Sequence, residues 1–495
     1  MARRALDPKG RLEIEIHPEA WQRIETAARM VEGIVAKGKA VYGINTGFGK
    51  FAEVAISSDN LVELQENLIR SHAVGTDEAL PRDIVALTWI LRLNTLCRGN
   101  SGVRRSSVEH ALRALDAGIL AIVPSRGSVG ASGDLAPSAH ATLALLGEGE
   151  ATRPHSQGFE RVDAGLALRD AGLEPLKLAP KEGLSFINGT QLTTALALKG
   201  WAEGRALLDH ANLACAMSVE GLRGSHRFAL DPILRVRNHP GAVACGEAIR
   251  AWLGGETEIL KSHENCGRVQ DPYSIRCAPQ VHGAIHDELV RAEEVIGREI
   301  NSSTDNPLLF PEDGSSLSGG NFHAIYTARV SDSLASALTT LSVISERRIA
   351  LAMAKESSQL PAFLTRNGGL NSGFMMAQVT AAALASEAKA LSFPASVDSI
   401  PTSGDREDHV SMGPAAGLKL MQILRNVSGV IAVEIMTAAQ ALSLLHPLKS
   451  SPSIQSALAT FRAKVPFLER DRFLGPDIEA AKSLIAEGVL LHRKE

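Results

Sequence analysis

The stretch SDSLASALTTLSVISERRIALAMAKES, residues 331–357, decides the fold class of this 495-residue chain. Apolar side chains recur in it at spacings of three and four residues, which is the period of a helix with one buried face. Ala, Leu and Met are strong helix formers, so propensity and periodicity agree. The stretch therefore predicts a long helix packed into a protein core.

Other segments of the chain repeat this pattern. Several of them exceed the 8 to 20 residues of an ordinary globular helix, as expected for long helices that pack side by side in one bundle. The additional helices are expected at residues 189–222, 279–300, 379–392 and 417–445. We therefore predict a mainly α fold, in which residues 191–495 form a central and C-terminal helical bundle.

The N-terminal part of the chain has a more mixed character. Short β-rich pieces such as RLEIEI (11–16) and AVYGI (40–44) alternate there with helical segments, so residues 1–190 are predicted to form a smaller, mixed domain. Rigid helical scaffolds concentrate binding and catalytic residues on the loops between the helices. Loops rich in Gly, Ser, Asn, Asp and Pro are predicted at residues 301–322, 366–373 and 394–406.

Charge and hydropathy argue against two classes of partner. The chain has 51 Lys and Arg against 55 Asp and Glu, a net charge of -4, and no long run of either sign that would follow a nucleic-acid backbone. No stretch of about 18 consecutive apolar residues is apparent, and no signal segment opens the chain. We therefore expect a cytoplasmic protein with no nucleic-acid or membrane partner.

Residue motifs argue against three further classes of site. The five cysteines lie apart without a CxxC pair, so we expect reduced thiols that act as buried small hydrophobes. No HExxH pair is present, and no metal is expected. A GxSxG elbow is also absent, which disfavours a hydrolase triad. The formal GxGxxA at residues 47–52 lacks a following βαβ pattern, so a bound nucleotide is not expected either.

A glycine-rich segment, GSVGASGDLAPSAH at residues 127–140, stands out from this background. It is too flexible for the interior of a helix and too poor in side chains for a core strand. We infer that the conformation of its backbone is what matters.

Two further segments combine charge with an aromatic residue or a helix start. QDPYSIRCAPQVHG, residues 270–283, places Tyr273 and Arg276 three residues apart just before a helix, and an Arg fork suits a substrate carboxylate. SGDREDHVSMG, residues 403–413, stacks charges before another helix. Taken alone, surface packing explains the first segment and N-terminal capping by Asp and Glu explains the second.

Taken together, the motifs of the chain resemble the aromatic amino acid ammonia-lyase family. The resemblance covers nearly the whole chain, and the motifs are long and occur in a fixed order. They are VYGINTGFG (41–49), SHAVG (71–75), NGTQ (188–191), QDPYSIRC (270–277), SSTDNPL (302–308), GGNFH (319–323), SGFMMAQVTAAALASE (372–387) and EDHVSM (407–412). The resemblance implies a mostly helical fold and a D2 homotetramer whose active sites are each assembled from three subunits.

The resemblance also gives the glycine-rich segment a chemical role. Ala131, Ser132 and Gly133 match the triplet that cyclises autocatalytically, with loss of two waters, into the electrophile 4-methylidene-imidazol-5-one. The Gly133 nitrogen must then attack the Ala131 carbonyl, and only residues this small let the backbone fold so tightly. The implied cofactor is thus built from the chain itself, with no metal or nucleotide.

Four further residues match positions of the family that act on the reacting atoms. By this resemblance, Tyr42 removes the β-proton of the substrate from a mobile lid loop. Asn188 and Tyr273 order the electrophile and the substrate amine, and Arg276 holds the α-carboxylate.

The expected substrate follows from the residues that match the side-chain pocket. Phe322 resembles a wall beside the substrate ring, whereas His72, Met375 and Glu407 resemble the lining of the pocket. A carboxylate at Glu407 can accept an imidazole N–H but would lie desolvated and unpaired against a phenyl ring. The resemblance therefore favours L-histidine as substrate, with trans-urocanate and ammonia as products.

Some positions depart from the pattern of histidine-specific members and leave alternatives open. Arg406 and Ala278 stand where many such members have Gln, and the SGD at 403–405 is similar to the NGD of tyrosine aminomutases. A cation beside Glu407 could pair with its carboxylate and weaken its role. The alternatives are a tyrosine or phenylalanine ammonia-lyase, an aromatic amino acid 2,3-aminomutase, and an inactive scaffold that keeps the fold without the chemistry.

Overall fold

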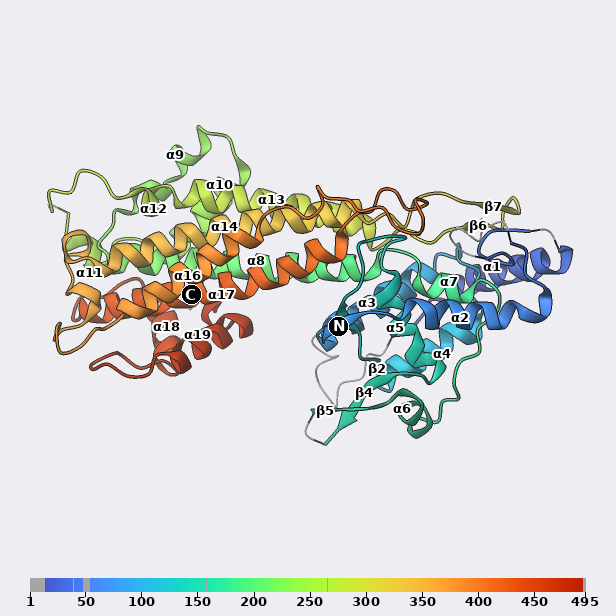
Figure 1. Ribbon diagram of the computed structural model, residues 1–495. Coiled ribbons are helices and arrows are strands. Elements are labelled where there is room, and N and C mark those ends of the chain that lie inside the picture. Colours follow the sequence, from blue (N-terminus) through green and yellow to red (C-terminus); the bar gives the residue numbers. More distant parts are fainter. Residues whose placement is uncertain (1–13, 39, 48–53, 157, 265, 493–495) are drawn as a thin grey trace. The chain divides into compact units, whose positions relative to one another are not determined.

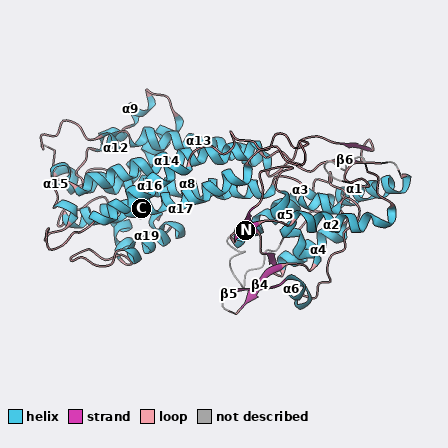
Figure 2. Ribbon diagram, viewed as in Figure 1, coloured by secondary structure: helices cyan, strands magenta, loops and turns pink. Residues whose placement is uncertain are grey.

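The structure of the chain is a computed structural model that describes residues 14–492 apart from residues 39, 48–53, 157 and 265 (Figure 1). Helices make up most of the described chain, and the strands are few and short (Figure 2). The predicted mainly α fold class is therefore confirmed.

The chain divides into two compact units, and neither is continuous in sequence. Unit 1 comprises Met1–Lys199, Glu294–Ser331 and Pro394–Leu418. Unit 2 comprises Gly200–Glu293, Asp332–Phe393 and Lys419–Glu495. Two segments from the second half of the sequence thus belong with the N-terminal segment, and the division into 1–190 and 191–495 stays a prediction.

Unit 1 combines short helices with small antiparallel sheets. Its helices are α1 (Pro18–Lys37), α2 (Leu61–His72), α3 (Arg82–Leu96), α4 (Arg105–Asp116), α5 (Leu135–Leu143), α6 (Ala164–Asp170) and α7 (Glu182–Ile187). Its strands are β1 (Thr76–Ala79) paired with β3 (Pro124–Arg126), β2 (Leu120–Ala121) paired with β4 (Glu150–His155), β4 paired with β5 (Gly158–Asp163), and β6 (Leu308–Phe310) paired with β7 (Ser315–Leu317).

Among its described residues, unit 2 contains helices joined by loops and no named strand. Its shorter helices are α9 (Asp231–Arg235), α10 (Pro240–Leu253), α11 (Glu258–Lys261), α12 (Tyr273–Arg276), α15 (Lys355–Ser358), α16 (Met375–Leu391), α18 (Pro452–Arg462) and α19 (Gly475–Glu487). The four longest helices contribute residues to both units: α8 (Gln191–Gly221), α13 (Ala278–Glu299), α14 (Ile325–Met353) and α17 (Gly413–Leu444).

The predicted long helices are confirmed, with boundaries that move by a few residues. The largest changes are at α14, which begins six residues before the predicted start, and at α16 and α17, which each begin four residues early. Hydrogen bonds connect these helices within unit 2. Trp201 of α8 donates its indole N–H to the Leu289 carbonyl of α13 at 3.1 Å, and the Thr339 hydroxyl of α14 donates to the Ala388 carbonyl of α16 at 3.2 Å.

Helix α17 is long and apolar enough to pass a test for a membrane span. However, 83% of its most apolar window is buried inside the protein. A core helix in a large bundle is hydrophobic on all sides, so this burial accounts for the composition of α17.

A buried ion pair lies in the core of unit 2. The guanidinium of Arg348 in α14 meets the carboxylate of Glu434 in α17 through two bonds, of 2.5 and 2.9 Å, and neither side chain has any exposed surface. Ser218 and Ser345 also donate hydroxyl bonds to this carboxylate. The remaining Arg348 nitrogen, Nη1, donates to the Ser274 carbonyl of α12 at 3.2 Å. The pair therefore anchors the backbone of the short helix α12 to the bundle.

Three local predictions were wrong. AVYGI forms no strand, because Ile44 and Asn45 donate their backbone N–H to Val41 and close a turn; the described part of RLEIEI, 14–16, has no regular structure. The segment 301–322 was predicted to be a loop, but it contains a hairpin. Its strands β6 and β7 pair antiparallel, from Leu308 with Leu317 to Phe310 with Ser315. The cysteines are all free thiols, but Cys215 and Cys245 alone are buried, and Cys266 is exposed.

Candidate active site

The triplet Ala131-Ser132-Gly133 lies in the loop that leads into α5, and its backbone adopts an unusual conformation. Ser132 has φ 47° and Gly133 φ 85°, both in the left-handed region that residues other than glycine rarely adopt. The Gly133 N–H donates back to the Gly130 carbonyl at 3.1 Å, which closes a tight turn around the triplet. The sequence-based prediction that the backbone is special here is therefore confirmed.

The segment around Gly189 holds this loop from the other side. The Gly189 N–H donates to the Ser132 carbonyl at 3.2 Å, and the Asp134 N–H donates to the Gly189 carbonyl at 2.8 Å. A Cβ at Gly133 would lie 2.1 Å from the Gly189 oxygen and 2.9 Å from the Phe322 carbonyl oxygen. Only glycine fits at position 133, and the Phe322 backbone is thereby placed beside the triplet.

The hydroxyl of Ser132 donates to Glu407 Oε1 at 3.0 Å. The other carboxylate oxygen of Glu407 accepts from the hydroxyls of Thr402 at 2.9 Å and Ser403 at 2.6 Å. The alternative interpretation, in which this charged segment caps the following helix, does not describe Glu407, because its carboxylate points to Ser132 instead. The structure thus brings together two predicted site residues that are 275 positions apart in the sequence.

The side chain of His72, the last residue of α2, is partly buried and its ring has a defined orientation. Its Nδ1 lies 2.8 Å from the Leu68 carbonyl, which can only accept, so Nδ1 carries the proton. Burial lowers the pKa of His72, while the Leu68 bond and the charge of Glu407 act in the opposite direction. The net result is a neutral ring near pH 7 whose Nε2 is a hydrogen-bond acceptor.

The carboxyl group of Asp134, directly after the triplet, is fully buried. It accepts bonds from the Thr193 backbone N–H at 2.9 Å and hydroxyl at 2.7 Å. Burial raises the pKa of Asp134 to about 6, although the Thr193 bonds and the charge of Arg92 oppose the shift. A carboxyl with this pKa can hold or release a proton near neutral pH.

Asn188 is the C-cap of α7, and in the described part of the chain all of its hydrogen-bonding groups except Oδ1 have partners. Its side-chain nitrogen donates to Asp305 Oδ1 and to the Asn306 carbonyl, each at 3.2 Å. Its own carbonyl accepts from Arg92, and its backbone N–H donates to Leu184 at 2.8 Å. Asp305 in turn accepts from the Lys181 ammonium at 2.8 Å, and neither partner of that ion pair has exposed surface.

Tyr42 lies in a turn near this Asn188 cluster. A Cβ at the neighbouring Gly43, which has φ 75°, would meet Leu184 of α7 at 2.7 Å and Pro307 at 3.0 Å. The turn thus packs against the two segments that carry Asn188 and its partner Asn306. Residues 48–53 of the predicted lid loop lie outside the described residues.

The remaining predicted residues, Tyr273, Arg276 and Met375, belong to unit 2. Tyr273 is 70% exposed, and the Arg276 guanidinium lies 4.5 Å from the centre of its ring. The Arg276 Nε donates to the Asp271 carbonyl at 3.0 Å, and the outer nitrogens of the guanidinium have no hydrogen-bond partner among the described residues. Met375, half-buried, is the first residue of α16.

The structure adds polar residues that the sequence did not single out: Arg92, Asp134, Lys181 and Asp305. They lie buried around the triplet and Asn188. Two signals could have found them: Asp134 directly follows the triplet, and Asp305 lies inside the motif SSTDNPL. His323 and His409 also stack here, with ring centres 5.3 Å apart, and each is close in sequence to a predicted residue, Phe322 or Glu407.

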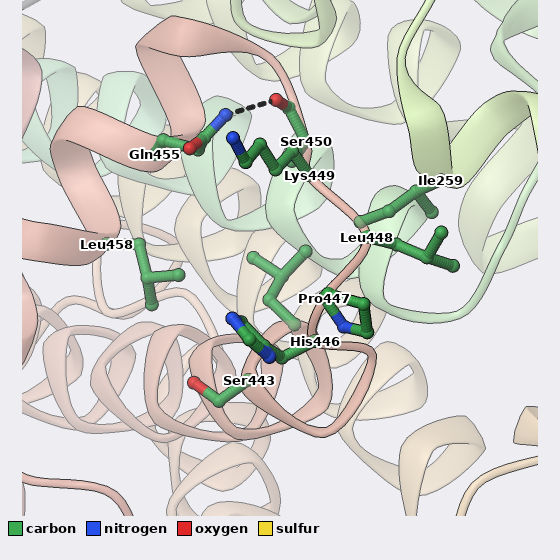
Figure 3. Close-up of a pocket in the computed structure, with 10 residues that line it drawn as sticks. Ile259, Ser443, His446, Pro447, Leu448, Lys449, Ser450, Gln455 and Leu458 are labelled. Carbon is green, nitrogen blue, oxygen red and sulfur yellow. Dashed lines mark hydrogen bonds between the residues drawn. The ribbon is translucent and has the colours of Figure 1, made fainter.

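A cavity of about 380 Å³ lies elsewhere, in unit 2, between the C-terminal end of α17 and helix α18 (Figure 3). Leu442, His446, Leu448 and Lys449 line it, and Gln455 donates to the Ser450 carbonyl at its wall. None of the predicted site residues lines this cavity. Among the described residues, no group of three or more His, Cys, Asp or Glu side chains could hold a metal ion.

Comparison with known proteins supports the family resemblance of the motifs along nearly the full length of the chain. Residues 4–463 match the family described as aromatic amino acid lyase. The chain is 47% identical over 479 residues to the histidine ammonia-lyase of Salmonella paratyphi B, which covers 97% of this chain and 94% of that protein.

Solved structures with the same fold include enzymes that are named for different activities. Histidine ammonia-lyase of Trypanosoma cruzi matches with a TM-score of 0.89 and 41% identity, covering 96% of this chain and 89% of that one. Tyrosine aminomutase of Streptomyces globisporus matches with a TM-score of 0.91 and 33% identity, covering 99% and 95%. The ergothionase of Treponema denticola matches with a TM-score of 0.91 and 29% identity, covering 99% and 98%.

Proposed function

This chain belongs to the aromatic amino acid lyase family, and from that premise we propose that it eliminates ammonia from L-histidine to give trans-urocanate. Identity of 47% over 97% of the chain to a histidine ammonia-lyase supports this reaction over the others in the family. The structural observation that carries it is the tight turn of the triplet, with the Ser132 hydroxyl bound to Glu407 at 3.0 Å.

We propose that Ala131, Ser132 and Gly133 form 4-methylidene-imidazol-5-one, the electrophile of this family. The residues present fit the group: the backbone already turns at Ser132 and Gly133, and no Cβ fits at position 133. When formed, the group supplies an electrophilic methylene that turns the substrate amine into a better leaving group. Glu407, whose carboxylate accepts from the Ser132 hydroxyl at 3.0 Å, is placed where it can accept or return a proton during its formation.

The side chains of this protein bind and deprotonate the substrate around that group. Arg276 binds the α-carboxylate through the outer nitrogens of its guanidinium. Tyr42 takes the β-proton as general base. This role requires the Tyr42 hydroxyl oxygen to lie within hydrogen-bond distance of the substrate β-carbon that carries the proton. Asn188 and Tyr273 hold the amine and the electrophile in position, and Phe322 covers the ring.

Three residues, His72, Met375 and Glu407, form the pocket for the imidazole. His72 is neutral with Nε2 as an acceptor, and Glu407 is a second acceptor, so the two together suit an imidazole ring, which can carry N–H donors. A phenyl ring would leave both groups unsatisfied.

We further propose a D2 homotetramer in the cytoplasm, with each site assembled from three subunits. The proposed site residues are divided between unit 1 and unit 2. Helices α14 and α16 also carry large apolar side chains that are exposed in the single chain, including Val343, Met376 and Val379. Such exposure is typical of a surface that another copy covers.

The second candidate is an aromatic amino acid 2,3-aminomutase. The similarity to tyrosine aminomutase and the Ser403-Gly404-Asp405 sequence favour it. The position of Arg406 argues against it, because this side chain is exposed and forms no ion pair with Glu407 among the described residues. Glu407 thus keeps its charge available for an imidazole.

The proposal is tested by supplying purified protein with L-histidine, L-tyrosine and L-phenylalanine separately and measuring ammonia release and the ultraviolet spectrum of each product. We expect ammonia and urocanate from L-histidine alone. Turnover of another amino acid without histidine, or a β-amino acid product, would replace the proposal by one of the alternatives. The mass of the peptide spanning residues 127–140, lighter by two waters, separately tests the electrophile.

A further inference from the structure

We propose that the buried ion pair of Lys181 and Asp305 fixes the amide of Asn188 so that its Oδ1 accepts a hydrogen bond from the substrate ammonium group. This makes Lys181 and Asp305 positioning residues, since they act through Asn188. The inference rests on the proposed function, because it concerns the same site and refines the role of Asn188 within it.

The orientation of the Asn188 amide follows from the groups around it. The side-chain nitrogen faces Asp305 Oδ1 and the Asn306 carbonyl oxygen, each at 3.2 Å. Both oxygens can only accept, so the flipped amide would place an oxygen against two oxygens. Both hydrogens of the nitrogen are thus used, and Oδ1 has no hydrogen-bond partner within the part of the chain that the structure describes.

Lys181 keeps Asp305 in the form that imposes this orientation. A protonated carboxyl would carry a donor and could accommodate either amide orientation. Burial opposes ionisation of Asp305, but the Lys181 charge and hydrogen bond at 2.8 Å outweigh it and leave the pKa of Asp305 below its usual value. The Asn306 N–H adds a bond of 2.7 Å to the same oxygen that Asn188 uses.

The backbone around the pair is fixed as well. Lys181 itself has φ 71°, a conformation that the surrounding contacts must maintain. Its ammonium also donates to the Ser185 hydroxyl at 3.0 Å, within the helix that ends at Asn188. Arg92 donates to the Asn188 carbonyl. The amide therefore has neither side-chain nor backbone freedom to turn.

An amide oxygen that has no hydrogen-bond partner among the described residues can bind a cationic N–H donor and cannot stabilise an oxyanion. Of the two roles that the family resemblance gives to Asn188, ordering the amine and ordering the electrophile, the geometry supports the first. The substrate ammonium is the donor that a bound amino acid brings.

Two variants of the ion pair test the inference. Asp305→Asn replaces the acceptor by an amide that can itself donate, so Asn188 can flip, and Lys181→Met removes the cation. We expect kcat/KM for L-histidine to fall by about 10- to 100-fold in both variants. A shift of a substrate-positioning group by about 1 Å can reduce the rate by about 100-fold. The inhibition constant of 3-(imidazol-4-yl)propanoate, which lacks the amine, should stay within about twofold of the wild-type value.

Glu182→Gln is the matched control. Glu182 neighbours Lys181, is equally buried, and binds Arg104 at 2.8 Å without contact to Asn188. It should change neither kcat/KM nor the inhibition constant. A merely structural role for the pair predicts instead that the ligand with and the ligand without the amine weaken together, which would overturn the inference; so would an unchanged kcat/KM in Asp305→Asn.

Two further experiments distinguish an effect on folding from an effect on activity. Because Lys181→Met leaves a buried carboxylate unpaired, the double variant Lys181→Met with Asp305→Asn removes both charges and supplies a folded counterpart. In a Ser132→Ala background, which lacks the electrophile, calorimetric binding of L-histidine should weaken on adding Asp305→Asn while binding of the amine-free ligand does not. Equal weakening of both refutes the inference, whereas failure of the wild type to turn over L-histidine refutes the proposed function alone.

Discussion

Two loops of unit 1 each bury an aspartate beside the proposed site, and the pKa values of the two carboxyl groups are shifted in opposite directions. Asp134, after the triplet, and Asp305, beside Asn188, are both almost completely buried. Asp305 meets the Lys181 ammonium at 2.8 Å, and its pKa is lowered despite burial. Asp134 accepts bonds from the neutral backbone N–H and hydroxyl of Thr193, and burial raises its pKa to about 6.

The difference shows that at nearly equal burial a contacting cation decides whether the pKa of a carboxyl group is lowered or raised. The Asn188 region thereby holds a fixed charge that orients an amide. The triplet region holds a group that can exchange a proton near neutral pH, where the proposed electrophile must lose two waters. The Asn188 region therefore positions a side chain, whereas the triplet region carries the groups that react.

The largest effect is expected from Ser132→Ala, which breaks the reactive region. Without the hydroxyl no methylidene group forms, so we expect kcat to fall by at least about 1000-fold, as for removal of an essential covalent group. The fold should persist, because the Ser132 side chain makes one hydrogen bond among the described residues. Steady-state ammonia release and circular dichroism check this; retained turnover contradicts the electrophile.

Lys181→Met breaks the positioning region and should make Asp305 resemble Asp134. We expect the free energy of unfolding at pH 7 to fall by about 3–5 kcal/mol, because the buried carboxylate loses its cation. Stability should then recover as pH decreases and Asp305 becomes protonated. Denaturant titration between pH 5 and 8 measures this, and a loss below about 1 kcal/mol would show that Lys181 does not hold the charge.

Asp134→Asn tests the opposite case. Because the folded pKa of Asp134 is raised to about 6, its contribution to stability is fully present below its unfolded pKa near 4 and is lost as pH rises through about 6. In the wild type the free energy of unfolding should therefore decrease by roughly 1–3 kcal/mol between pH 4 and 7 because of Asp134, and the variant should lack this decrease. The slope of the unfolding free energy against pH is the measurement, since the lost Thr193 bond shifts all values equally. An unchanged slope would contradict the raised pKa.

The smallest effect is expected at the partly exposed His72. The charge of Glu407 raises the pKa of His72 against the larger lowering by burial, so Glu407→Gln should lower that pKa further. Titration of the ring followed by NMR checks the direction. A rise in the pKa of His72 would show that Glu407 does not act on this ring.

The sequence predicted the long helices well because their information is local. Helices α8, α13, α14, α16 and α17 each carry an apolar period long enough to identify without knowledge of their neighbours. The strand predicted at AVYGI was wrong for the opposite reason: its β-branched residues satisfy the propensity, but a turn closed by Val41 and Asn45 takes the backbone groups. The small hairpin at 308–317 has no such period and was missed.

The candidate site shows the same division. The residues Ser132, Glu407, His72 and Asn188 were predicted from motifs, and their functional roles stay proposals. The motifs did not indicate that Ser132 contacts Glu407 or that Asp305 holds Asn188. Both contacts join segments more than 100 residues apart.

The sequence by itself therefore determined the helical bundle, the triplet and the set of polar residues with which such a triplet occurs. The tertiary structure alone decided in which direction the pKa of each buried carboxyl group shifts and which way the side chains face. The physical reason is that helix formation depends on spacing along the chain, whereas the pKa of Asp134, the ionised state of Asp305 and the orientation of Asn188 depend on burial and on partners brought near by folding.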